Sequence, residues 1–199
     1  MSASQPMTLT AYQQAQQVSQ DAVRTAILDR AISLLTTHGH AALTVRRIAA
    51  EAGCSTKVLY TLFSGKDGLV DALGREGFAR LGRALERVPH HRDPLAHLTA
   101  LTLAYRAHAR AEPAYYEIMF AGFAPGPEAS WAALGILESA CAACVQAGQA
   151  IGDPRQIAVQ LWTTVHGAVS LELSGFVGRE HGDRLLAAPR LEALLNTGR

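Results

Sequence analysis

Residues 44–66 read TVRRIAAEAGCSTKVLYTLFSGK, and this stretch decides the fold of the amino-terminal part of the chain. Thr44 can cap a first short helix through its hydroxyl, and Gly53 can end that helix because glycine adopts the left-handed backbone conformation without steric cost. Ser55 can cap a second helix, whose apolar side includes Leu59. Two short helices joined by a three-residue turn predict a helix-turn-helix motif, whose second helix can enter the major groove of DNA.

Positive charge is concentrated around this motif. Residues 44–66 contain four Lys or Arg and one Glu, residues 1–90 have a net charge of +3, and residues 91–199 have a net charge of −2. Contact with DNA phosphates requires such a local excess. A solvated basic face on an ordinary helix pair is the alternative, but the turn residues, the apolar spacing and the charge all favour a DNA-binding motif.

The motif resembles the DNA-binding head of TetR-family transcriptional regulators. The similarity runs from about residue 22 to residue 73 and depends on residues 44–55, followed by Leu59-Tyr60, Phe63 and residues 66–69 (KDGL). The resemblance implies a three-helix head, a homodimer, and a separate helical body that binds a small inducer.

Most of the candidate DNA-binding residues lie at the starts of the predicted helices. We expect Thr44, Tyr60 and the exposed member of the pair Arg46 and Arg47 to contact phosphate. The first residues of the second helix should face base edges or the nearby DNA backbone. Lys66 is expected to anchor the next helix to a phosphate beside the free N–H groups of its first turn. The predicted set is Thr44, Arg46, Arg47, Ser55, Thr56, Lys57, Tyr60 and Lys66.

Helical signals divide the chain into four parts. Residues 1–18 are polar and rich in Gln, and they predict a disordered or loosely helical arm. Residues 19–66 predict the helix-turn-helix domain, in which the first helix starts at Ser19 or Asp21. Residues 67–88 predict a connecting helix. Residues 93–199 predict a helical ligand-binding and dimerisation domain.

The connecting helix has two unusual features. Ser64 and Asp67 have the spacing of a capping box at its start. It also contains Gly74, Gly77 and Gly82, each of which costs about 1 kcal/mol relative to Ala in a helix interior. These glycines indicate either close helix packing or a compliant lever between body and head.

The second half of the chain is helical throughout, so we expect an all-α protein. Its predicted helices cover 94 to about 112, 114–123, 128 to about 150, 154–173 and 183–196, the last of them kinked or divided by Pro189. Residues 161–173, LWTTVHGAVSLEL, resemble a TetR subgroup marked by Trp and then His-Gly in the penultimate helix. That resemblance implies a homodimer formed through the last two helices, about 154–196.

Aromatic residues of this half form the best candidate for a ligand pocket, because helical bundles place ligands between facing helices. Packing in an ordinary core is the alternative for each of them, and His166 can be a core or interface histidine or a polar ligand contact. The predicted ligand-binding set is Tyr105, His108, Tyr116, Met119, Phe120, Phe123, Trp131, Trp162 and His166.

Catalytic and metal sites are not indicated. Cys141 and Cys144 form a CxxC pattern that can share one helix face, but a thiol switch or metal site needs further ligands, and burial in the core is the simpler interpretation. The adjacent His90 and His91 have no partner at ligand spacing and predict a solvated loop. We find no catalytic triad and no phosphate-binding glycine loop, so no catalytic residue, metal or cofactor is expected.

These observations predict a ligand-responsive regulator that binds double-stranded DNA. The chain has no apolar run of about 18–20 residues and no secretory signal, and its three cysteines do not make a disulfide framework, so we expect no membrane association and a cytoplasmic location. We expect a homodimeric repressor that a small molecule releases from a palindromic operator. The alternatives are an activator or ligand-independent DNA binder, and an enzyme that uses Cys141 and Cys144 or His166. The effector, the operator sequence and the regulated genes stay open.

Overall fold

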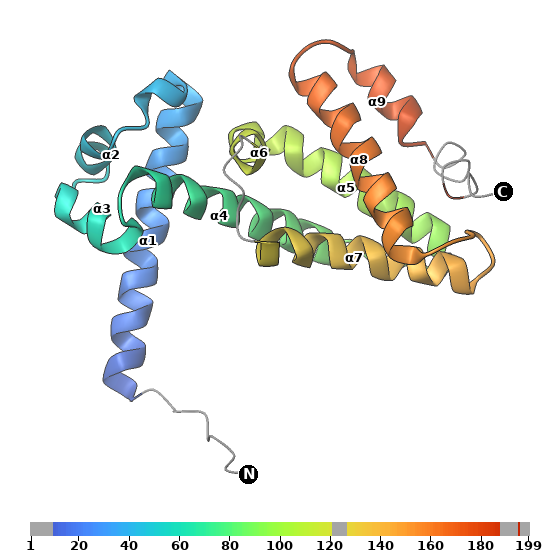
Figure 1. Cartoon of the computed structure of the whole chain (residues 1–199), viewed down its shortest axis with the longest axis horizontal. Coiled ribbons are helices and arrows are strands. Elements are labelled where there is room, and N and C mark those ends of the chain that lie inside the picture. The colour runs from blue at the N-terminus through green and yellow to red at the C-terminus, as the bar shows by residue number, and fades with distance from the viewer. Residues whose placement is uncertain (1–9, 121–126, 188–194, 196–199) are drawn as a thin grey trace. The chain divides into compact units, whose positions relative to one another are not determined.

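The computed structural model describes residues 10–120, 127–187 and 195, with the backbone alone for 127–131 and 185 (Figure 1). Within these ranges all regular structure is helical, which confirms the predicted all-α fold. The helices are α1 (Ala11–His38), the short 3₁₀ helix η1 (His40–Ala42), α2 (Val45–Glu51), α3 (Thr56–Phe63), α4 (Lys66–Glu86), α5 (Pro94–Ala111), α6 (Pro113–Phe120), α7 (Pro127–Gln146), α8 (Pro154–Leu173) and α9 (Arg179–Leu185). None of these described helices combines the length and the apolar character that crossing a membrane requires.

The chain forms two compact units, Met1–Ala72 and Leu73–Arg199. The first contains α1, α2, α3 and the start of α4, and its buried side chains include Ile27, Ile48 and Leu59. Arg24 of α1 donates to the backbone carbonyl of Leu62 at 2.9 Å, and its guanidinium lies 4.6 Å from the ring centroid of Phe63. This cation–π contact and hydrogen bond hold α1 against the end of α3.

Two details of the first unit differ from the prediction. Helix α1 begins at Ala11, because Thr10 and Gln13 form a reciprocal capping box, so the predicted start at Ser19 or Asp21 is wrong. Residues 11–22 are all exposed, and they therefore lack the apolar period on which the prediction depended. Ser64 does not cap α4. It ends α3 with a left-handed backbone (φ 59°), and α4 begins two residues later.

The second unit is a bundle in which α5, α7 and α8 lie against one another (Figure 1). Its core is continuous, and most of its buried side chains are aliphatic or aromatic, with Leu81, Leu98, Leu137, Leu161 and Val165 among them. Asp93 and Asp153 cap α5 and α8, each followed by Pro at the first helical position.

Helix α9 is attached by a buried ion pair. Arg106 of α5 is 5% exposed and donates to the Glu172 carboxylate at 2.7 Å, to Asp183, and to the backbone carbonyl of Arg179 at 2.8 Å. These bonds join α5, α8 and α9. The last helix was predicted over 183–196, but α9 begins at Arg179 and ends at Leu185, and the predicted kink at Pro189 lies outside the described residues.

Candidate functional site

The first candidate site is the surface formed by α2, α3 and the start of α4. Thr44 accepts a hydrogen bond from the backbone N–H of Arg47 at 3.3 Å and so caps α2, as predicted. Gly53 has φ of 65°, in the left-handed region, and the Cys54 N–H donates to the carbonyl of Ala49 at 2.9 Å. Residues 52–55 therefore make the tight connection that a helix-turn-helix requires, one residue longer than predicted.

All the residues predicted to contact DNA lie in this first unit. Arg47 is half-buried and the others are exposed. Ser55 precedes α3, but its hydroxyl makes no capping hydrogen bond. Tyr60 is 58% exposed, and a Cβ atom at Gly65 would lie 3.4 Å from its ring, so the ring lies along the backbone that links α3 to α4.

Cationic side chains mark two points of this surface. Lys57 lies in the first turn of α3, and Lys66 is the first residue of α4. Neither has an ion-pair partner among the described residues. Both ammonium groups are exposed at helix N-termini, where free backbone N–H groups also favour an anion.

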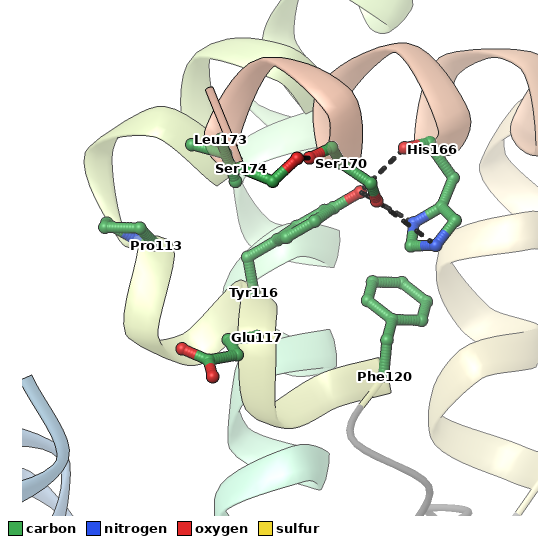
Figure 2. Close-up of a pocket in the computed structure, with 8 residues that line it drawn as sticks. All are labelled: Pro113, Tyr116, Glu117, Phe120, His166, Ser170, Leu173 and Ser174. Atoms are coloured by element: carbon green, nitrogen blue, oxygen red, sulfur yellow. Dashed lines mark hydrogen bonds between the residues drawn. The ribbon is translucent and has the colours of Figure 1, made fainter. Parts of the chain in front are cut away.

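The second candidate site is an open pocket of about 580 Å³ in the helical bundle. Figure 2 shows Tyr116 and Phe120 extending from α6 towards His166 and Ser170 on α8. The lining residues are Pro113, Tyr116, Glu117, Phe120, His166, Ser170, Leu173 and Ser174. Residues 166, 170 and 174 follow one another at four-residue steps, so they share one face of α8 and its C-terminal end.

A small polar group lies at the inner wall of this pocket. The Tyr116 hydroxyl lies 2.6 Å from Nδ1 of His166, and Ser170 Oγ lies 3.4 Å from the Tyr116 oxygen and 3.5 Å from Nε2 of His166. Burial lowers the pKa of His166 and raises the pKa of Tyr116, so both side chains are neutral near pH 7. The pocket therefore offers neutral hydrogen-bonding groups.

Aromatic rings surround this polar group. The Phe120 ring lies 4.1 Å from the His166 ring and 5.1 Å from the Tyr116 ring, measured between centroids. Behind them, Trp162 donates to the Tyr105 hydroxyl at 3.2 Å. The structure thus brings together five residues of the predicted ligand set, and Phe78 of α4 joins them through edge contacts with Phe120 and Trp162.

The predicted ligand set is only partly found at the pocket. Tyr116, Phe120 and His166 line it, whereas Tyr105 and Trp162 lie behind its wall. Met119 is buried against α4, and His108 is half-buried among charged residues of α4 and α5. Phe123 and the side chain of Trp131 lie outside the described residues.

Five lining residues were missed by the sequence analysis: Pro113, Glu117, Ser170, Leu173 and Ser174. Ser170 and Ser174 were accessible from the sequence, because they stand four and eight residues after His166 on a predicted helix. Pro113, Glu117 and Leu173 join the pocket through the packing of α6 on α8, which no local pattern reveals.

The cysteine pair belongs to the core. Cys141 and Cys144 are fully buried among the apolar side chains of the bundle, and burial raises the pKa of Cys141 to about 12 and also raises that of Cys144. A buried thiol with a raised pKa is a poor nucleophile. No group of three or more potential metal ligands occurs in the described part of the chain.

One histidine contact was not anticipated. His97 of α5 stacks on His90, with ring centroids 4.8 Å apart, and its ring lies 6.2 Å from that of His91. The loop histidines are exposed, as predicted, but His90 is packed against a helix rather than surrounded by solvent alone.

Comparisons with known proteins agree with this geometry. Residues 27–73 match the family described as bacterial regulatory proteins, tetR family, and residues 98–193 match the family described as tetracyclin repressor-like, C-terminal domain. No functionally curated protein matches the chain.

Solved structures share the same architecture. A protein of unknown function from Rhodococcus sp. RHA1 is 30% identical, with a TM-score of 0.76 over 88% of this chain and 96% of that chain. A bacterial regulatory protein of the tetR family from Rhodococcus RHA1 is 17% identical, with a TM-score of 0.70 over 89% and 98% of the two chains. The transcriptional regulator FadR from Bacillus subtilis, solved in complex with stearoyl-CoA, is 17% identical, with a TM-score of 0.69 over 88% and 98%.

Proposed function

Since this chain belongs to the TetR family of transcriptional regulators, we propose that it is a homodimeric repressor that a small molecule releases from a palindromic DNA operator. The observation that carries this proposal is the pairing of an exposed cationic helix-turn-helix in one unit with an aromatic pocket in the other. The regulators in its family are typically not enzymes, and its buried cysteines, with their raised pKa values, argue against thiol chemistry.

DNA contact is assigned to the surface of α2, α3 and the start of α4. Ser55, Thr56 and Lys57 stand at the exposed start of α3, where a helix inserted in the major groove presents its side chains to base edges. Thr44, Tyr60, Lys66 and Arg46, the exposed member of the pair Arg46 and Arg47, contact phosphates and set the orientation of that helix.

Dimerisation is assigned to the outer face of α8, together with the segment that follows it. Between residues 156 and 171 this helix contains no Lys, Arg, Asp or Glu. Val159, Thr163, Gly167 and Leu171 recur at four-residue steps, and Val159 and Leu171 are both exposed apolar residues. An uncharged stripe along the exposed face of a helix has the composition of a homodimer interface.

Ligand response is assigned to the pocket at Tyr116, Phe120 and His166. Binding of stearoyl-CoA by Bacillus subtilis FadR, a protein of the same fold, supports the idea that this architecture accommodates effectors. A ligand can change DNA affinity only by favouring one arrangement of the protein over another. Helix α6 can transmit that preference, because its other face, at Tyr115 and Met119, packs on Gly77 of α4.

The test selects DNA from a random duplex pool with the purified protein at about 150 mM salt, close to physiological ionic strength. Recovery of a palindromic sequence, bound by two copies in sedimentation analysis, is the expected result. A protein that is monomeric and shows no preference for any duplex under these conditions would overturn the proposal. Transcription from a promoter that carries the selected sequence then separates a repressor from an activator.

A further inference from the structure

Two hydrogen-bond donors in the pocket have only long contacts. The Tyr116 hydroxyl has two acceptors within reach, Nδ1 of His166 at 2.6 Å and the backbone carbonyl of His166 at 3.3 Å, and the much shorter contact assigns its proton to Nδ1. Neutral His166 then carries its proton on Nε2, whose contact is Ser170 Oγ at 3.5 Å. The Ser170 hydroxyl lies 3.4 Å from the Tyr116 oxygen. Both distances exceed the usual 2.7–3.2 Å range.

The neighbouring Ser174 hydroxyl adds no third free donor to the pocket. Ser174 donates to the backbone carbonyls of Ser170 at 2.7 Å and of Leu171 at 3.2 Å, so its proton is used within α8. A ligand oxygen placed near His166 and Ser170 would therefore gain two short hydrogen bonds in exchange for two long ones.

The charge of the lining residues excludes one broad class of ligand. Among the described lining residues Glu117 is the one acidic residue, and none is Lys or Arg. Transfer of a carboxylate or phosphate into this site without a cationic partner in the lining carries a desolvation cost that an uncharged ligand avoids.

The remaining surface of the pocket is apolar. This apolar surface comes from Pro113, Phe120, Leu173 and the ring of Tyr116. Phe120 is 36% exposed although its ring packs on His166. A large aromatic side chain that stays partly exposed at a pocket provides a flat surface for an apolar ligand.

We infer that this pocket binds an uncharged, largely apolar molecule whose hydrogen-bond acceptor, such as a carbonyl oxygen, is held by His166 and Ser170. The inference rests on the proposed role of the pocket as the effector site and names the chemical class of the effector. His166 and Ser170 select a ligand that carries an acceptor oxygen. The absence of a lining cation among the described residues selects against anionic analogues of that ligand, including free acids and acyl-CoA esters.

The experiment compares three small probes of nearly equal shape on the wild-type protein by titration calorimetry at pH 7.5. They are 2-acetylnaphthalene, which carries a carbonyl oxygen; 2-ethylnaphthalene, which carries none; and 2-naphthoate, which is anionic. The ketone should bind at least tenfold more tightly than the carboxylate and at least threefold more tightly than the hydrocarbon, about the effect of one net hydrogen bond. No detectable binding of the ketone, or binding of the carboxylate as tightly as the ketone, overturns the inference.

Two matched variants locate the binding. Ser170→Ala should reduce the advantage of the ketone over the hydrocarbon by at least threefold, because it removes one donor. Ser139→Ala removes a hydroxyl from an exposed position on α7, where it bonds to the carbonyl of Gly135, and should leave that advantage unchanged. An equal effect of both variants would place the ketone elsewhere and overturn the inference.

Operator binding in the same samples separates this inference from the proposed function. Ketone binding in the pocket without any change in operator affinity would support the ligand class and contradict ligand-released repression. Release from the operator by 2-naphthoate or by an acyl-CoA, with no effect of the ketone, would support the regulation and contradict the ligand class.

Discussion

At the scale of single residues, the position of a side chain on its helix assigns its role. Lys57 and Lys66 are both exposed lysines, but Lys57 lies in the first turn of the helix assigned to the major groove, whereas Lys66 starts the helix that follows. A cation that reaches base edges influences which sequence is bound, and a cation on phosphate influences only the affinity.

The first prediction concerns these two lysines. Lys66→Ala should weaken binding to all duplexes alike and reduce the slope of log affinity against log salt by about 0.9 for each phosphate that the side chain neutralises. Lys57→Ala should also change the preferred sequence. Fluorescence anisotropy with selected and scrambled duplexes measures both effects, and Arg92→Ala, at an exposed position outside the motif, is the charge control. An unchanged salt slope in the Lys66 variant would refute its role.

The second prediction concerns acid stability. Burial lowers the pKa of His166, and burial likewise lowers the pKa values of His97 and His108. The unfolded chain binds protons more readily at these positions than the folded chain does. These histidines therefore leave the free energy of unfolding unchanged above the ordinary histidine pKa of about 6.5, and they lower it as the pH falls below that value.

Thermal unfolding at pH 7.5 and pH 5.5 measures this loss. His166→Gln should reduce the difference in Tm between the two pH values, because one half-buried imidazole no longer resists protonation. His38→Gln replaces an exposed histidine and should leave the wild-type difference intact. Identical pH dependence in the wild type and the His166 variant would contradict this assignment.

At the scale of elements, α6 is the link between pocket and connecting helix. Tyr116 and Phe120 face the pocket, whereas Tyr115 and Met119 face α4. The four-residue step within each pair puts its two members on one helix face, and the two pairs lie on different faces of α6. Gly77 makes this contact close: a Cβ atom there would lie 2.6 Å from Cγ of Met119 and 3.3 Å from the carbonyl oxygen of Tyr115.

The third prediction tests this link. Gly77→Ala should displace Met119 and change the operator affinity of the ligand-free protein by at least fivefold, as a pocket ligand would. Gly82→Ala, in the same helix with open space around the added Cβ atom, should leave operator affinity unchanged. The double variant Gly77→Ala with Met119→Ala should recover wild-type affinity, because it removes the clash. A Gly77 variant that differs only in Tm would show that the glycine serves packing alone.

The fourth prediction concerns the attachment of α9. A Cβ atom at Gly182 would lie 2.8 Å from Nε of Arg106 and 2.8 Å from a carboxylate oxygen of Glu172, so Ala at this position must separate a buried ion pair. We expect Gly182→Ala to destabilise the protein by about 1–3 kcal/mol in urea unfolding. Gly135→Ala in α7 meets open space and should be neutral or stabilising. Equal stability of the two variants would contradict the role of this ion pair.

At the scale of the whole molecule, the proposed function depends on two copies presenting two reading helices to one duplex. The uncharged stripe of α8 is the surface assigned to that pairing. A single charge placed there would be buried without a partner in the dimer, whereas the same charge on an outer surface would stay solvated.

The fifth prediction follows from this assignment. Val159→Glu should shift the protein to a monomer in sedimentation velocity experiments and lower operator affinity at least tenfold. Leu103→Glu changes a similarly exposed apolar residue of α5 and should leave the dimer intact. Dimers that persist in the Val159 variant would place the interface elsewhere.

The sequence by itself determined the helical fold and the helix-turn-helix. Both depend on local signals: Thr44 and Asp93 cap the helices that follow them, Gly53 takes the left-handed backbone conformation, and apolar residues repeat at the helical period. It also indicated the aromatic composition of the pocket. The start of α1 escaped prediction because residues 11–22 bury nothing.

Only the tertiary structure decided which aromatic residues line the pocket and which support it. Tyr105 and Trp162 are hydrogen-bonded to each other behind the wall of the pocket. Glu117 and Leu173, from different helices, line the pocket. The buried ion pair of Arg106 and Glu172 joins residues 66 positions apart. Such contacts depend on how helix faces meet across the bundle, and the period of a single helix does not specify its partner.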